Sequence, residues 1–191
     1  MARELRLGGL NVPIGVIATS WGGTSITKWS SKEALKNCST DGSSDLWNGM
    51  VYPLTRMPIT GIMFMQGEAD SGSEASGLRY ACNILSMARS WRSTWDLRSR
   101  KPAAEIVFLD YQLAPSNNSD GFTNVRNSQL AVETLMNASV VIDIDLYTPD
   151  SPCGSVHFQD KQPAGARAAA IMRALAFHDN NPHAAPTPVA V

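Results

Sequence analysis

Three short polar clusters in this sequence carry groups that could assist acyl transfer, and each follows an apolar run. The first is Thr19–Thr24, with the sequence TSWGGT. Because adjacent glycines permit unusual φ angles and close approach of a ligand, the backbone N–H groups of Gly22 and Gly23 could form part of an oxyanion hole. A tight turn between a strand and a helix, with Ser20 as its cap, is the structural alternative.

The second cluster, Gln66–Asp70, has the sequence QGEAD and also follows an apolar run. The side-chain amide of Gln66 could donate a hydrogen bond to a developing oxyanion, with the carboxylate of Glu68 beside it. A polar loop with a glycine turn would have the same composition, so this cluster by itself leaves both interpretations open.

The third cluster is the segment PDSPCGSVHFQDKQ, residues 149–162, which contains His157. The other two histidines lie at or beyond the end of the last predicted helix. A histidine in a loop just before that helix is well placed to act as a general base, and Asp150 or Asp160 could orient its ring. A structural or solvated histidine is the alternative.

The elements that position these clusters follow from the apolar spacing. Runs rich in Val, Ile and Phe predict buried strands over Ile14–Ser20, Ile59–Gln66, Glu105–Leu113 and Ser139–Ile144. Helical spacing predicts helices over Met1–Leu10, Ser73–Trp95, Phe122–Met136 and Gln159–Phe177. This alternation favours an α/β fold with a parallel sheet and helices on both faces.

Parallel strands end at a common edge of the sheet, where α/β proteins place their sites, so we expect the three clusters to converge there. The predicted helix Met1–Leu10 runs directly into a strand, whereas a strand normally comes before such a helix. The chain is therefore expected to start inside a domain, with the first strand of the sheet missing.

Composition excludes several classes of protein. The chain has 191 residues, 43% of them hydrophobic and 17% charged, with a formal net charge of −1. This is typical of a globular domain without the basic excess that nucleic-acid binding requires. The apolar runs are too short for membrane insertion. The chain contains neither G-x-G-x-x-G nor G-x-x-x-x-G-K-[ST], which argues against a nucleotide binder of flavodoxin-like fold.

The three cysteines, Cys38, Cys82 and Cys153, form no C-x-x-C pair, so no metal site is predicted from them. Buried free thiols and one disulfide with an unpaired third cysteine both remain open. No signal peptide is visible at the start of the chain. Three N-x-S/T sequons, at Asn37, Asn117 and Asn137, hint at a secretory origin.

Four segments occur in a characteristic order: PIGVIATSWGGTSITKW, LWNGMVYPL, GIMFMQGEAD and DSPCGSVHFQDKQ. Together they resemble the sialate O-acetylesterase family, carbohydrate esterases of the SGNH hydrolase superfamily, over Ala2–Phe177. The resemblance implies a flavodoxin-like α/β fold: a partial esterase domain over residues 1–179, with a tail over 180–191 that we expect to be disordered. It also implies cofactor-free and metal-free hydrolysis of O-acetyl esters on sialic acids or related sugars by a Ser–His pair.

The same resemblance assigns roles to individual residues. Gly22 or Gly23 would supply an oxyanion N–H, Gln66 the side-chain donor and His157 the catalytic base. On the substrate side it implies four further residues: Glu68, Trp21, Arg126 and Gln129. The full-length protein would be secreted or lysosomal.

Three departures from the family pattern affect these expectations. The G-Q-S-N block that carries the nucleophile does not occur in this sequence, so activity is expected to be impaired. The position three residues before the histidine, commonly Asp, is Gly154, and we therefore expect Asp150 to be the orienting carboxylate. The residue after the histidine is Phe158 rather than the usual Pro.

A catalytically inactive carbohydrate-binding remnant of the same fold is the alternative function. Trp21, Trp29 and Trp47 flank the predicted site, and aromatic faces suit sugar rings. Core packing is the other role that these tryptophans could have.

Overall fold

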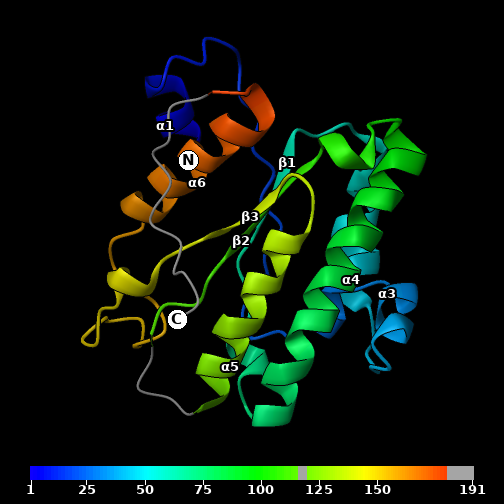
Figure 1. The fold of residues 1–191 in the computed structure, drawn as a ribbon, viewed down its shortest axis with the longest axis vertical. Helices are drawn as coiled ribbons and strands as arrows, with labels where there is room; N and C mark the ends of the chain where they lie inside the picture. Colours follow the sequence, from blue (N-terminus) through cyan, green and yellow to red (C-terminus); the bar gives the residue numbers. More distant parts are fainter. Residues whose placement is uncertain (116–119, 180–191) are drawn as a thin grey trace.

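The computed structural model describes residues 1–115 and 120–179, and the predicted tail, 180–191, lies outside them. Its centre is a parallel sheet of three strands, β1 (Gly61–Phe64), β2 (Val107–Tyr111) and β3 (Ala138–Val141), in the order β1-β2-β3 (Figure 1). The register places Phe64 beside Asp110, and Asp110 beside Val140. All five residues of β2 are buried, as expected for a central strand covered on both faces.

The described residues also form six α-helices: α1 (Ala2–Leu7), α2 (Ile26–Trp29), α3 (Lys32–Asn37), α4 (Glu74–Ser99), α5 (Asp120–Gln129) and α6 (Gln162–Phe177). Short 3₁₀ or π turns lie at Trp47–Val51, Tyr52–Arg56, Glu68–Asp70, Ala103–Glu105, Leu130–Thr134 and Ile144–Leu146. Among the described residues, no helix is both long and apolar enough to cross a bilayer.

The helices cover both faces of the sheet, which confirms the predicted fold class (Figure 1). Because successive side chains of a strand point to opposite faces, β2 contributes to two separate cores. Phe108 packs with Ile84 and Met87 of α4 on one face. Val107 and Leu109 pack on the other face, in the core that contains Leu5 of α1 and Ala168 of α6.

The prediction of a strand over Ile14–Ser20 is wrong. This segment has no regular structure, and Val16 and Ile17 are 59% and 51% exposed. β-branched residues favour extended backbone, but a strand also requires a hydrogen-bonded neighbour, and this segment has none among the described residues. The other three strands are confirmed, each shorter than predicted.

The predicted helices also have counterparts in the structure. α4 begins after Ser73, whose side chain accepts a hydrogen bond from the backbone N–H of Ser76 in a capping box, and it extends four residues beyond the predicted end at Trp95. The predicted helix Phe122–Met136 stops being α-helical at Gln129 and continues as a 3₁₀ turn to Thr134.

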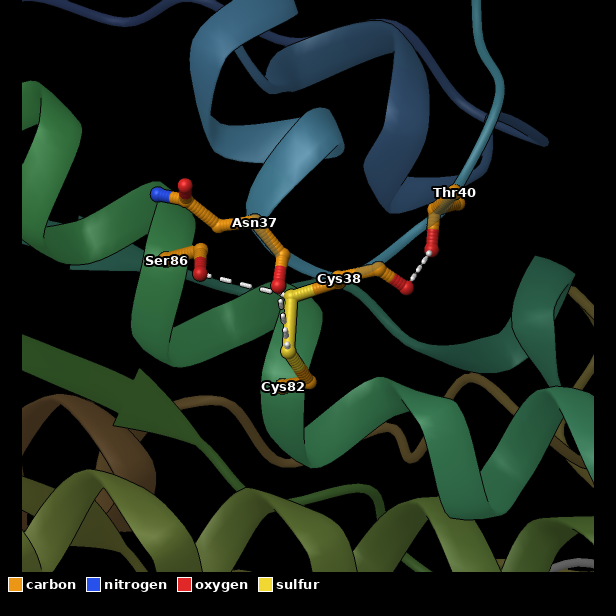
Figure 2. The surroundings of a disulfide bond; sticks show 5 residues. All are labelled: Asn37, Cys38, Thr40, Cys82 and Ser86. Carbon is orange, nitrogen blue, oxygen red and sulfur yellow. Dashed lines mark hydrogen bonds between the residues drawn. A yellow bond between two sulfur atoms is a disulfide. The ribbon is translucent and has the colours of Figure 1, made fainter.

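A disulfide between Cys38 and Cys82 joins the end of α3 to α4, and Figure 2 shows its surroundings. The hydroxyl oxygen of Ser86, one turn further along α4, lies 3.3 Å from the Cys38 sulfur. Cys153 is free and exposed. Of the two alternatives for the cysteines, the structure therefore has one disulfide with an unpaired third cysteine.

Replacing the disulfide by Cys38→Ser and Cys82→Ser should lower the free energy of unfolding by about 2–4 kcal/mol, because the bond closes a long loop in the unfolded chain. Urea denaturation followed by circular dichroism measures the change. Cys153→Ser is the matched control and should leave the midpoint in place. Equal stability of the double variant and the parent would show that the bridge does not form in solution.

Arg167 holds α6 against the end of β3. Its guanidinium donates to the backbone carbonyl of Ile142 at 2.6 Å and to the Asp145 carboxylate at 2.7 Å. Asp143 is fully buried, and neither of its oxygens has a hydrogen bond to a described residue. Arg167 Nη1 lies 3.6 Å from Asp143 Oδ1. Burial raises the pKa of Asp143 to about 7, although the nearby Arg167 charge opposes that shift.

This raised pKa predicts that stability falls as the pH rises. The folded state keeps the Asp143 proton up to about pH 7, whereas the unfolded chain releases it near pH 3.8. The stabilisation from Asp143 is therefore complete below its unfolded pKa of 3.8, and it is lost as the pH rises through its folded pKa of about 7. We expect the parent protein to lose about 2 kcal/mol of unfolding free energy between pH 5 and 8.

Denaturant melts at several pH values measure this slope, and Asp143→Asn should flatten it. Asp145→Asn is the control, since Arg167 lowers the pKa of Asp145 and its contribution is lost only in acid. If the parent protein instead became more stable between pH 5 and 8, the statement that Asp143 is uncharged in the folded state would be contradicted.

Candidate active site

A cleft of about 1160 Å³ lies beside β1, and it is lined by residues 61–64 of the strand and by Met65, Gln66 and Glu68 beyond it. Most residues between Val12 and Thr24 also line it. All three polar clusters reach this cleft, and they contribute these lining residues: Trp21, Gly22, Gly23, Gln66, Glu68 and His157. Segments far apart in the sequence are thus brought to one rim of the sheet.

The first cluster forms an open turn. Gly23 has φ +69°, a left-handed conformation that favours glycine, and the space around Gly22 and Gly23 is open. Their backbone N–H groups donate no hydrogen bond to any described residue. The Thr24 hydroxyl donates to the Trp21 carbonyl at 2.7 Å and accepts from Trp29 Nε1 at 2.9 Å, which ties the turn to the buried core. The two glycine amides are therefore free to bind an anionic oxygen.

Gln66 is held by its neighbours at the end of β1. Its Nε2 donates to the Thr24 carbonyl at 2.9 Å and to Asp70 Oδ2 at 2.6 Å. The Tyr80 hydroxyl lies 3.0 Å from both the Gln66 carbonyl and Gln66 Oε1. Both amide hydrogens of Gln66 thus have protein acceptors. Donation to an oxyanion would require breaking the hydrogen bond to Thr24 or to Asp70. In this structure Gln66 joins the glycine turn to the sheet.

Asp70 extends this cluster to the start of α2. Its Oδ2 also accepts from the backbone N–H of Ile26 at 2.9 Å. Burial raises the pKa of Asp70, and the hydrogen bonds from Ile26 and Gln66 oppose that shift. We call Thr24, Gln66, Asp70 and Tyr80 the Gln66 cluster. Sequence reasoning did not assign a role to Asp70 or Tyr80, although Asp70 stands within the QGEAD segment.

His157 lies on an exposed loop that is anchored through its backbone. Its N–H donates to the Gly154 carbonyl at 2.9 Å, and its carbonyl accepts from the Ser151 hydroxyl. The adjacent Phe158 is buried, and Lys161 Nζ lies 3.3 Å from the centre of its ring. Within the described part of the chain, no hydrogen bond restrains the imidazole. The imidazole ring therefore lies at the cleft, but no hydrogen bond to a described residue fixes its orientation.

The carboxylates near His157 differ in whether they line the cleft. Asp150 is exposed and does not line the cleft. Glu68 lines the cleft with His157, and the two residues also line a smaller adjoining pocket that includes Lys161. Among the acidic residues with described side chains, Glu68 is thus the one that shares both linings with His157.

The two predicted substrate-side residues on α5 lie away from the cleft lining. Gln129 is fully buried: its Nε2 donates to the Tyr111 carbonyl at 2.8 Å, and its Oε1 accepts from the backbone N–H of Leu113 at 2.8 Å. Arg126 is half-buried, and burial lowers the pKa of its guanidinium. Gln129 therefore holds the backbone at the end of β2 through its hydrogen bonds to Tyr111 and Leu113. No group of three or more potential metal ligands was found in residues 1–115 and 120–179.

This chain is similar in sequence to the sialate O-acetylesterases of mammals. Human sialate O-acetylesterase is 33% identical over 197 residues, which cover 90% of this chain and 37% of that protein. The mouse protein of the same name is 28% identical and matches 90% of this chain and 41% of its own length. The chain therefore spans well under half the length of these relatives.

A solved structure, that of a carbohydrate acetylesterase from Xanthomonas citri, superposes with a TM-score of 0.79 at 26% sequence identity. The match covers 93% of this chain and 40% of the bacterial one. The family model for carbohydrate esterases described as sialic acid-specific acetylesterases matches residues 1–172. The chain therefore belongs to the sialic acid-specific acetylesterase family of carbohydrate esterases.

Proposed function

We propose that this domain takes part in the hydrolysis of O-acetyl esters on sialic acids or related sugars. The observation that carries the proposal is that Gly22, Gly23 and His157 line a single cleft. Two free amides and a histidine can serve as the oxyanion donors and the general base of an acyl-transfer site, which also requires a nucleophile. Family membership supports the acetyl ester as the substrate class.

The proposed chemistry follows from these groups. A hydroxyl nucleophile attacks the acetyl carbon while His157 takes its proton, and the oxyanion of the tetrahedral intermediate binds the amides of Gly22 and Gly23. His157 then returns the proton to the sugar oxygen as the ester bond breaks. Water, deprotonated by the same histidine, releases acetate from the acyl-enzyme. We propose Glu68, which lines the same cleft as His157, as the carboxylate that orients the imidazole in both steps.

The G-Q-S-N block that is expected to carry the nucleophile does not occur in residues 1–191. Ser20 lines the cleft, but it belongs to the oxyanion turn. We therefore propose that this chain alone is impaired and that a nucleophile from additional polypeptide completes the site. The disulfide, which is typical of oxidising compartments, supports a secreted or lysosomal setting for the longer protein. Asn37, the asparagine of one of the three sequons, is exposed.

Hydrolysis of p-nitrophenyl acetate tests the proposal directly. The chain alone should show turnover near background, and a form extended by the preceding segment of human sialate O-acetylesterase should gain activity. In the extended form, His157→Ala should lower kcat by about 10²–10⁴-fold, because the general base is lost. His178→Ala, at the end of α6, is the matched control and should keep full activity.

Two outcomes would contradict this assignment. A folded extended form that stays inactive would remove the support for the esterase. Activity of the chain alone that disappears in Ser20→Ala would instead make Ser20 the nucleophile.

A sugar-binding remnant is the second candidate, and the exposure of Trp21 favours it. Trp21 is 65% exposed at the cleft, whereas the other four tryptophans are at most 5% exposed. Trp29 and Trp47 thus pack in the core. An exposed indole beside a cleft can stack on a sugar ring.

The unequal exposure makes tryptophan fluorescence a selective probe of the cleft. Titration with an O-acetylated sialoside should quench the exposed component of the emission, and Trp21→Phe should abolish that quenching. The unacetylated sialoside controls for recognition of the ester. No quenching at millimolar sugar would count against the binding remnant.

A further inference from the structure

The small pocket that adjoins the cleft is lined by one lysine and no arginine. The pocket shares Glu68 and His157 with the cleft, so the two spaces meet at the proposed site. Its third titratable lining residue with a charged side chain is Lys161, whereas no lysine or arginine lines the cleft. Arg126, the cation expected on the substrate side, lines neither space. Among the described residues, Lys161 is therefore the one lysine or arginine that reaches the site.

The ring of Phe158 holds the ammonium group of Lys161. Lys161 Nζ lies 3.3 Å from the centre of that ring, and Phe158 is buried in the core that includes residues of α6. A cation over an aromatic ring is attracted by the negative face of the ring, which restricts the conformations of an otherwise flexible lysine. Because Phe158 directly follows His157 in the chain, this contact ties the lysine charge to the loop of the proposed base.

Lys161 forms no ion pair with a described residue. Asp143 acts on its charge from a distance, but burial raises the pKa of Asp143 to about 7, so this carboxyl is mostly uncharged below pH 7. Lys161 directly precedes α6, whose first turn contains no acidic residue. Partial burial lowers the pKa of Lys161, and Asp143 and Glu68 oppose that shift. The ammonium group thus has a ring beside it but no paired anion in the described chain.

The size of the pocket limits what can reach Lys161 there. Its volume is about 20 Å³, which accommodates one small polar group but no sugar ring. The cleft, with about 1160 Å³, has room for the ring. A ligand that occupies both spaces would therefore place its ring in the cleft and one small group, of the size of a carboxylate, at the pocket.

We propose that Lys161 binds the carboxylate of an acidic sugar, and that Phe158 positions the lysine for this contact. The inference rests on the proposed ester hydrolysis and adds the charge of the substrate to it. The ammonium group would donate charge-assisted hydrogen bonds to the carboxylate. Glu68 lines the same pocket and repels an anionic sugar, so binding of such a sugar requires a compensating positive charge, which Lys161 supplies. The site would then prefer a carboxylated sugar to a neutral sugar with the same ester.

Binding to the chain itself tests the inference without a need for turnover. The probes are the glycoside of an O-acetylated sialic acid and its carboxamide, a neutral analogue with the same ring and the same ester. NMR titration gives a dissociation constant for each. The carboxylate form should bind at least about 5-fold more tightly than the carboxamide. Sodium chloride at about 0.5 M should reduce this ratio, because salt screens an exposed ion pair.

Three variants separate the charge of Lys161 from its packing. Lys161→Met keeps an apolar side chain but removes the charge, so the ratio of the two affinities should fall to about 1. Lys161→Arg keeps a positive charge and should retain part of the preference. Lys36→Met, which removes an exposed lysine charge on α3, is the matched control and should keep the parent ratio. Thermal melts followed by circular dichroism verify that each variant is folded.

Phe158→Leu tests the positioning role of the ring. Leucine keeps an apolar side chain in the core but has no aromatic face, so the affinity for the carboxylate form should fall about 2- to 5-fold. The affinity for the carboxamide should stay the same, since that ligand does not depend on the lysine charge. A purely structural effect of this variant would weaken both ligands equally, and that result would contradict the positioning role.

Three further results would overturn the inference. One is equal affinity of the parent for the two sugars, and another is an unchanged preference in Lys161→Met. The third is a shift of the Lys161 side-chain signals by sodium acetate as large as that by the acidic sugar at equal concentration, which would assign the lysine to a free carboxylate. If the folded chain bound neither sugar, the proposed substrate would fail as well, whereas equal binding of both contradicts the role of Lys161 alone.

Discussion

The parallel pairing of β2 with β1 and β3 is the interaction on which the rest of the structure depends. It brings strands that begin at residues 61, 107 and 138 into register, so their following loops meet at one edge. β2 is buried on both faces, and its alternating side chains hold the α4–α5 layer and the α1–α6 layer on opposite sides. The loop after β1 and the loop that carries His157 reach the same cleft because of this arrangement.

The Gln66 cluster adds a second constraint, between the sheet and a turn that is not part of it. The segment before Gly22 has no strand partner among the described residues, so the turn is positioned by side chains instead. Thr24, Asp70 and Tyr80 satisfy the buried amide of Gln66, and Asp70 also holds the start of α2. A buried amide without these partners would cost free energy, which makes the cluster a rigid support for the two free glycine amides.

Both constraints position residues that line the cleft beside β1. The turn with Gly22 and Gly23 lines the same cleft as His157, and among the described residues β1 pairs with β2 alone.

The sequence by itself determined the fold class, three of the four predicted strands and the three polar clusters, because apolar periodicity and turn residues are local properties. Tertiary structure decided the rest. Residues 14–20 have strand-forming side chains but no partner, and pairing is a non-local condition. Which cysteines join depends on α3 lying against α4, which no spacing reveals. Gln129 is buried and Gln66 has both hydrogens bonded because neighbours from distant segments surround them, and hydrogen-bond partners are set by packing rather than by residue type.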